Sequence, residues 1–241
     1  TSNPDLSRFS PAKRRWPRPQ PGMFLAPMVA QSLLQESASA PNGAFCGSKV
    51  PHLTAKRSRS QDLRPFGGPA TKVAQEFAWA VSLQQSGDFA SAARLYARVV
   101  EHAPLHFDAV HLLGVAIFQS GDAAGAVPHL ERAISLRPRS AEAQNNLGVS
   151  LRALGRTREA AERYAVAHRI TPDYADARHN LASALSALLG EARKILEISG
   201  PAKALEGFVT VLAINPKNLD AILGCGYCLR RLGKPDEALK L

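Results

Sequence analysis

The sequence is poor in the residues that disulfides and membrane spans require. Its 241 residues include 3 cysteines, too few and too widely spaced for a disulfide framework, so we expect a reducing, cytoplasmic compartment. No apolar run reaches the ~18 residues that cross a bilayer. Aromatic residues make up only 6%, and the abundance of alanine and leucine indicates small side chains packed between helices.

Signatures of catalysis and of cofactor binding are also missing. There is no glycine-rich phosphate loop, no His/Asp/Glu cluster at metal-ligand spacing, and no Ser or Cys nucleophile in a recognisable setting. The pair Cys225 and Cys228 has no second pair to complete a four-ligand zinc site. The helical pattern predicts buried packing for Cys225. We therefore expect a protein that is not an enzyme and that has neither a cofactor nor a metal site.

Positive charge is concentrated at the N-terminus. The formal net charge is +10, and residues 1–72 contribute 11 Lys/Arg against 3 Asp/Glu. This segment is also rich in Pro, Ser and Gly, and no helical or strand period is sustained in it. A segment of this composition cannot bury enough apolar surface to offset its backbone entropy. We predict that residues 1–71 are disordered, either as a solvated linker or as a basic arm attracted to nucleic acid or an acidic surface.

A repeat of thirty-four residues organises the rest of the chain. The triplet Leu-Gly-Val in HLLGVAIFQSGD (111–122) recurs thirty-four residues later in NNLGVSLRALGR (145–156). Apolar pairs at i and i+4 predict two helices per block, and a glycine at position fifteen and a proline at position thirty-two predict their ends. The blocks are 73–106, 107–140, 141–174, 175–218 and 219–241. Their small residues at position eight are Ala80, Gly114, Gly148, Ala182 and Gly226, and alanines at position twenty precede the bulky Tyr96, Leu130, Tyr164 and Phe208 at position twenty-four.

This pattern resembles the tetratricopeptide repeat. The resemblance covers about 170 of the 241 residues and implies an all-α fold, a right-handed α-solenoid of stacked antiparallel helix pairs. One pair alone cannot bury its apolar face, so neighbouring pairs must stack. Together with the N-terminal segment, the expected organisation is a disordered basic region (1–71) followed by a solenoid (73–241).

Three details depart from the regular pattern. The fourth block has about ten extra residues, and helical spacing continues through Gly190, so we predict a long first helix ending near Ile198; a short extra helix after Gly190 is the alternative. Pro128 falls inside a second helix, and we place it in the first turn, where a missing N–H is tolerated. The fifth block stops at Leu241, shortly after its second helix begins, which suggests a truncated chain.

The resemblance implies that positions two, five, nine and twelve of the first helices line a concave groove. Asn146 and Asn180, at position six, add two amides at repeat spacing. Because a primary amide both donates and accepts hydrogen bonds, we expect the asparagines to hold an extended peptide backbone without reading its sequence; a solvated polar face is the alternative. The Lys at position five and the Asn at position nine of chaperone-tail binders are absent, which argues against that ligand. The candidate groove residues are His111, Phe118, Asn145, Asn146, Arg152, His179, Asn180 and Arg230.

Three functions remain open from the sequence. The first is a non-catalytic scaffold that binds a peptide segment of a partner protein in the groove. The second follows from residues 93–122 and 141–156, which are similar to the opening repeats of large bacterial proteins that carry an O-linked N-acetylglucosaminyltransferase-like domain. This second function is that of the substrate-recruiting arm of such a glycosyltransferase. The third is nucleic-acid association through the basic N-terminal segment, which predicts salt-sensitive binding.

Overall fold

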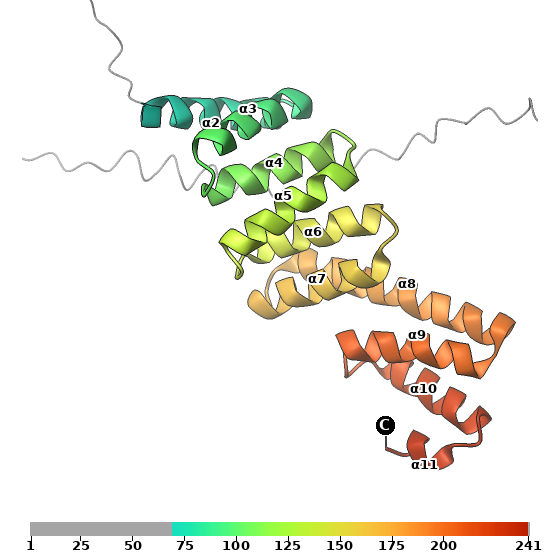
Figure 1. Cartoon of the computed structure of the whole chain (residues 1–241). Coiled ribbons are helices and arrows are strands. Elements are labelled where there is room, and N and C mark those ends of the chain that lie inside the picture. Colours follow the sequence, from blue (N-terminus) through green and yellow to red (C-terminus); the bar gives the residue numbers. More distant parts are fainter. Residues whose placement is uncertain (1–68, 241) are drawn as a thin grey trace, which may run out of the picture.

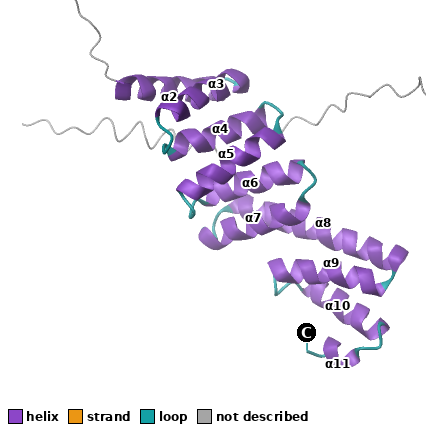
Figure 2. Ribbon diagram, viewed as in Figure 1, coloured by secondary structure: helices purple, strands orange, loops and turns teal. Residues whose placement is uncertain are grey.

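The chain folds into a row of antiparallel helix pairs (Figures 1 and 2). The computed structural model describes residues 69–240, and every regular element in that range is a helix. This confirms the predicted all-α solenoid. The predicted disorder of the basic segment stays a prediction, because residues 1–68 lie outside the described part of the chain. The pairs are α2 (Pro69–Gln85) with α3 (Phe89–His102), α4 (Phe107–Gln119) with α5 (Ala123–Leu136), α6 (Ala141–Ala153) with α7 (Thr157–Ile170), α8 (Ala175–Ser199) with α9 (Pro201–Ile214), and α10 (Leu219–Arg231) with the one-turn α11 (Pro235–Ala238).

The turn inside each of the first three pairs depends on the glycine at position fifteen. Gly87, Gly121 and Gly155 have φ angles of +88°, +102° and +77°, in the left-handed region that glycine enters without steric cost. In the first two turns the next residue, Asp88 or Asp122, accepts a hydrogen bond from the backbone N–H three residues further on. This side-chain cap starts the second helix. The turn thus ends one helix and begins the next within a few residues.

The small residue at position eight is the surface on which the second helix packs. A Cβ added to Gly148 would lie 2.6 Å from the ring of Tyr164, and one added to Gly114 would lie 2.8 Å from the side chain of Leu130. Both bulky side chains are fully buried. The packing of the residue at position twenty-four onto the glycine at position eight therefore holds the two helices of each of these pairs together.

The core formed by this packing is continuous along the row. One cluster of buried side chains spans α2 to α6, a second spans α4 to α10, and Ile117 and Ile134 pack against both. No helix among residues 69–240 combines the length and the apolar character needed to cross a membrane. In the two buried clusters, the apolar residues of the repeat join neighbouring helix pairs.

The ten extra residues of the fourth block lengthen one helix, as predicted. Helix α8 runs unbroken through Gly190 and ends at Ser199, after which Gly200 takes a φ of +85° and Pro201 begins α9. Ten residues of α-helix correspond to a length of about 15 Å. Helix α9 pairs with the C-terminal half of α8, and the last repeats are offset from the first ones (Figure 1).

This offset corrects one prediction. Ala182, the small residue expected at position eight of the fourth block, is exposed. Ala192, ten residues further on, is buried instead and faces Gly207 of α9. The packing position moves along the helix together with the insertion, so counting forward from the start of the block gives the wrong residue.

The prediction that Pro128 lies in the first turn of its helix is also wrong. Helix α5 begins at Ala123, which makes Pro128 its sixth residue and removes a hydrogen bond to the carbonyl of Ala124. Both residues are on the surface. Water can therefore reach the carbonyl that the proline leaves without a partner.

Candidate functional site

The predicted groove residues come from the first helices α4, α6, α8 and α10. The structure sorts them by their exposure to solvent. Arg152, His179 and Arg230 are exposed, His111 and Phe118 are half-buried, and Asn145, Asn146 and Asn180 are buried.

The three asparagines join neighbouring repeats. Asn180 Nδ2 donates to Asn145 Oδ1 at 3.0 Å, Asn145 Nδ2 lies 3.4 Å from the Tyr174 hydroxyl, and Asn146 Nδ2 lies 3.0 Å from His111 Nε2. In both contacts between first helices, position five of one helix meets position six of the next. Asn145 has 0% of its surface exposed. The amides expected to meet a peptide backbone thus already bond across the boundaries between repeats.

A signal for this arrangement was present in the sequence. Each bonded pair consists of a polar residue at position five and an asparagine at position six of the following block, thirty-five residues later. Sequence reasoning took both positions as surface and missed that successive first helices pack directly on each other. A polar pair at a separation of one repeat plus one residue is the pattern of an inter-repeat hydrogen bond.

We expect the Asn145–Asn180 pair to behave as a coupled unit in unfolding experiments. Asn145→Leu or Asn180→Leu alone leaves a buried amide without its partner and should lower the free energy of unfolding by about 1–3 kcal/mol. The double variant removes both polar groups, so its loss should be clearly smaller than the sum of the single losses. Urea unfolding of the wild type, the two single variants and the double variant measures the coupling energy between the two amides. Strictly additive losses would contradict a buried bond between the two amides.

His111 lies in an aromatic and charged environment at the second repeat. Its ring stacks on Phe107 with centroids 5.5 Å apart, and the Arg137 guanidinium carbon lies 3.9 Å from the Phe107 centroid. Burial lowers the pKa of His111 to about 4, against a smaller opposing effect of Glu142 and Asp108. The imidazole is therefore neutral at physiological pH, in agreement with Nε2 accepting the hydrogen bond of the asparagine amide.

Sequence reasoning also missed a row of carboxylates at position two of the first helices. Acidic residues stand there in four consecutive blocks, in the first turn of each helix, where the helix dipole favours negative charge. Two of them are exposed and two are half-buried. The row adds negative charge at the N-terminal ends of the first helices, at the opposite end of α6 from the exposed Arg152. It consists of Asp108, Glu142, Asp176 and Asp220.

The two tyrosines at position twenty-four differ in their hydroxyl groups. Tyr96 donates to Gln84 Oε1 at 2.9 Å, whereas the buried hydroxyl of Tyr164 has no hydrogen-bond partner. Burial raises the pKa of Tyr164 to about 12, an effect that the nearby Arg152 guanidinium partly opposes. The same fold position thus holds one satisfied and one unsatisfied hydroxyl.

This difference predicts that the same Tyr-to-Phe substitution lowers stability at one position and not at the other. Tyr96→Phe removes a hydrogen bond and leaves Gln84 buried without it, so the free energy of unfolding should fall by about 1–2 kcal/mol. Tyr164→Phe removes only an unpaired hydroxyl and should leave stability unchanged or slightly raised. Thermal and urea unfolding of the two variants, measured side by side, test this. A loss of similar size in both would show that Tyr164 has a partner in solution.

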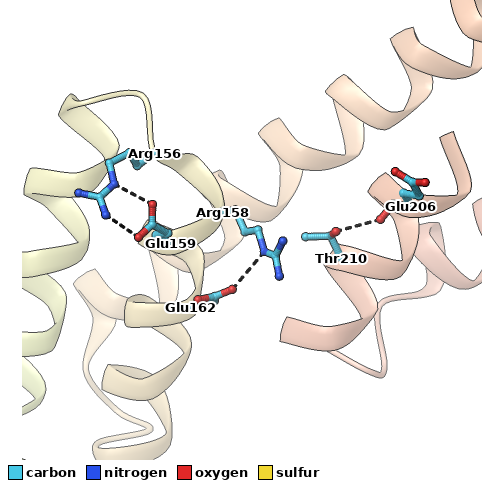
Figure 3. A network of polar contacts seen from close by, with 6 residues as sticks. All are labelled: Arg156, Arg158, Glu159, Glu162, Glu206 and Thr210. Carbon is cyan, nitrogen blue, oxygen red and sulfur yellow. Dashed lines mark hydrogen bonds and ion pairs between the residues drawn. The ribbon is translucent and has the colours of Figure 1, made fainter. Parts of the chain in front are cut away.

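A cleft of about 590 Å³ lies between the start of α7 and the middle of α8. Its arginines are already paired, Arg156 with both oxygens of Glu159 at 2.7 and 2.6 Å and Arg158 with Glu162 at 3.2 Å (Figure 3). These pairs are exposed, so they contribute little to stability. Across residues 69–240 no group of three His, Cys, Asp or Glu side chains is placed to hold a metal ion.

The two C-terminal cysteines are buried in the packing of α10, as predicted for Cys225. Both are free thiols, and burial raises the pKa of each. A thiol must ionise to act as a nucleophile or metal ligand. The structure thus gives Cys225 and Cys228 the environment of small core residues.

The geometry defines a class of protein, a solenoid of helix–turn–helix repeats with a recurring small residue, turn glycine and terminal proline. A family model described as tetratricopeptide repeat matches residues 77–138 and 118–175. Residues 77–175 therefore match tetratricopeptide repeats, as the sequence pattern predicted. The match lies within the repeats, so the glycosyltransferase-arm alternative and the cytoplasmic location stay predictions.

Several solved structures are similar to the chain. A crystal structure of MamA is 23% identical with a TM-score of 0.47, covering 71% of this chain and 88% of its own. The first tetratricopeptide domain of Spaghetti (RPAP3), bound to an HSP90 peptide, is 19% identical with a TM-score of 0.48, covering 51% and 98%. The tetratricopeptide domain of P58(IPK) is 15% identical with a TM-score of 0.47, covering 71% and 49%. No curated protein matches the chain.

Proposed function

We propose that the protein is a non-catalytic interaction scaffold that binds a peptide segment of a partner protein along the first helices of its repeats. The observation that supports this most is the position of Arg152 and His179, two exposed polar side chains at groove positions of consecutive first helices. The buried hydrogen bond between Asn145 and Asn180 joins α6 to α8. A rigid surface of this kind binds without first having to be ordered.

The chemistry of the surface indicates how a peptide is held. Arg152 offers charge-assisted donors to peptide carbonyls or carboxylates, and the exposed Glu142 accepts from backbone N–H groups or lysine. Half-buried Phe118 adds an apolar edge. The asparagines act indirectly, by holding α6 against its neighbours, and the peptide meets the side chains that remain exposed.

The experiment is a selection of ten-residue peptides from a random displayed library on the full chain, followed by fluorescence-polarisation measurement of the enriched peptides. Arg152→Glu combined with His179→Glu should weaken binding at least tenfold, or about 1.4 kcal/mol. Arg158→Glu is the control, because Arg158 is also exposed but lies on the second helix α7. Absence of enriched peptides, or equal loss in both variants, would refute the groove as the binding surface.

A further inference from the structure

Helix α8 links two parts of the row of helix pairs. Its first half packs against α7 and its second half against α9, which begins directly after it (Figure 1). The start of α7 lies level with the middle of α8, where residues of both helices line the cleft described above. The inserted residues therefore make α8 the link between an N-terminal body, residues 69–187, and a C-terminal body, residues 191–240.

The polar contacts that join repeats at this link lie within one body or the other. In the N-terminal body Asn180 donates to Asn145 at 3.0 Å, and in the C-terminal body Arg193 contacts Asp220 at 3.0 Å. Between the described helices α6 and α7 on one side and α9 and α10 on the other, no hydrogen bond or ion pair is formed. The two bodies are therefore joined by the backbone of α8 and by apolar packing.

Polar side chains near the junction bond within their own helix (Figure 3). Arg158 contacts Glu162 on α7, and the Thr210 hydroxyl donates to the Glu206 carbonyl on α9 at 2.8 Å. Apolar packing continues through the junction at Leu189, which is buried. Hydrophobic burial is not directional. It therefore permits a small rotation of one body that a directional bond would oppose.

Gly190 is the weakest point of α8 and lies at the junction. Its neighbours Leu188 and Glu191 line the cleft, whereas Gly190 is exposed and a Cβ built on it would meet no atom within 4 Å. Glycine costs a helix about 1 kcal/mol relative to alanine, and sharp kinks occur where Gly and Ser are combined. Ser186, one turn earlier, is exposed as well. Water can therefore replace the backbone bond from Gly190 to Ser186 when the helix bends.

The direction of bending follows from the positions around the helix. At about 100° per residue, Gly190 lies roughly 130° from the midpoint of Leu188 and Glu191, and on the same side as the groove residue His179 about three turns earlier. A bend that opens the helix at Gly190 therefore closes the cleft on the other side. The cleft, of about 590 Å³, provides the space into which α8 can bend.

We propose that α8 is a hinge at Gly190, about which the two bodies rotate so that the cleft narrows as the groove widens. The helix continues to Ser199 beyond the glycine. This arm is about 15 Å long, so a kink of about 20° moves its end by about 5 Å. Hinge motion of this kind changes the distance between two bodies and leaves each of them intact.

The hinge has a consequence for the groove, which rests on the proposed function, whereas the hinge itself does not. Arg152 and His179 belong to the N-terminal body, and the candidate groove residue Arg230 belongs to the C-terminal body. Bending at Gly190 changes the distance between Arg230 and the other two. A peptide that contacts all three residues would select one bend angle from those that the free chain adopts.

Double electron–electron resonance on the full chain tests the hinge. The three native cysteines are replaced by alanine, and spin labels are attached at exposed helix positions. The pair Glu101→Cys with Lys203→Cys spans the two bodies, and the pair Glu101→Cys with Arg169→Cys lies within the N-terminal body. The distance distribution of the spanning pair should be about 5 Å wider than that of the internal pair.

Two substitutions in α8 locate the pivot. Gly190→Ala should remove about half or more of the excess width, because alanine strengthens the helix and its Cβ meets no neighbour. Ala182→Gly is the control, since it weakens α8 by a similar amount at an exposed position of the half that packs on α7. It should leave the excess width as in the wild type.

Equal widths for the two label pairs would overturn the hinge. An excess width that Gly190→Ala leaves unchanged, or that Ala182→Gly increases, would overturn Gly190 as the pivot. None of these measurements uses a peptide. Failure of the hinge and failure of peptide binding at Arg152 and His179 are therefore distinguishable.

Discussion

Gly148→Leu is expected to destabilise the solenoid by about 3 kcal/mol or more, the largest effect of any single substitution considered for this chain. A Cβ at Gly148 already lies 2.6 Å from the ring of Tyr164, and Tyr164 is fully buried, so neither the new side chain nor the ring has room to move. Overpacking of this kind usually costs 1–3 kcal/mol and occasionally more. Chemical unfolding followed by circular dichroism measures the loss.

Gly190→Leu is the matched control for this substitution. Gly190 also lies in the interior of a helix, but a Cβ there would meet no atom within 4 Å. Replacing an internal glycine by leucine removes a helix penalty of up to about 1 kcal/mol, so this variant should be as stable as the wild type or more so. Similar losses at both positions would contradict the close approach of α6 and α7 at Gly148.

The second large effect is a loss of stability in acid that depends on His111. Its pKa is lowered to about 4 in the folded chain, against about 6.5 in an unfolded chain. Between these values the unfolded state binds more protons, so the free energy of unfolding falls as the pH falls from about 6.5 to about 4. This pKa difference between the folded and the unfolded chain lowers the free energy of unfolding by about 3 kcal/mol once the pH lies below both values.

His111→Gln isolates this contribution, because glutamine does not titrate and fits a similar volume. Urea unfolding of both proteins at several pH values between 7 and 4 gives two curves. We expect the stability difference between wild type and variant to shift in favour of the variant as the pH is lowered. Parallel curves would show that the His111 pKa is not lowered, and hence that its imidazole is not held neutral beside Asn146.

Much of the fold follows from local chemistry that the sequence displays. The turn glycines such as Gly121 and the prolines at position thirty-two act within a few residues of themselves, so their spacing predicts where helices end. The run through Gly190 is predicted for the same reason, since one glycine costs a helix less than a break in its apolar face. These features need no knowledge of distant contacts.

The errors arise where two segments far apart in the sequence decide the outcome. Ala182 loses its packing role because the insertion moves the contact with α9 to Ala192. Asn145 and Asn180 leave the candidate groove because successive first helices bury them against each other, thirty-five residues apart. Position in a repeat predicts which face a residue occupies, but its exposure depends on how closely the neighbouring repeat packs. The candidate site is therefore only partly readable from the sequence.

The most direct test of the account is a two-dimensional NMR titration of the isotope-labelled chain with a peptide obtained from the library selection. The account predicts that the shifted amide signals cluster on α4, α6 and α8, around Phe118, Arg152 and His179, and that α3, α5 and α7 are little affected. Shifts confined to the second helices, or to the cleft at Arg156 and Arg158, would contradict binding along the first helices.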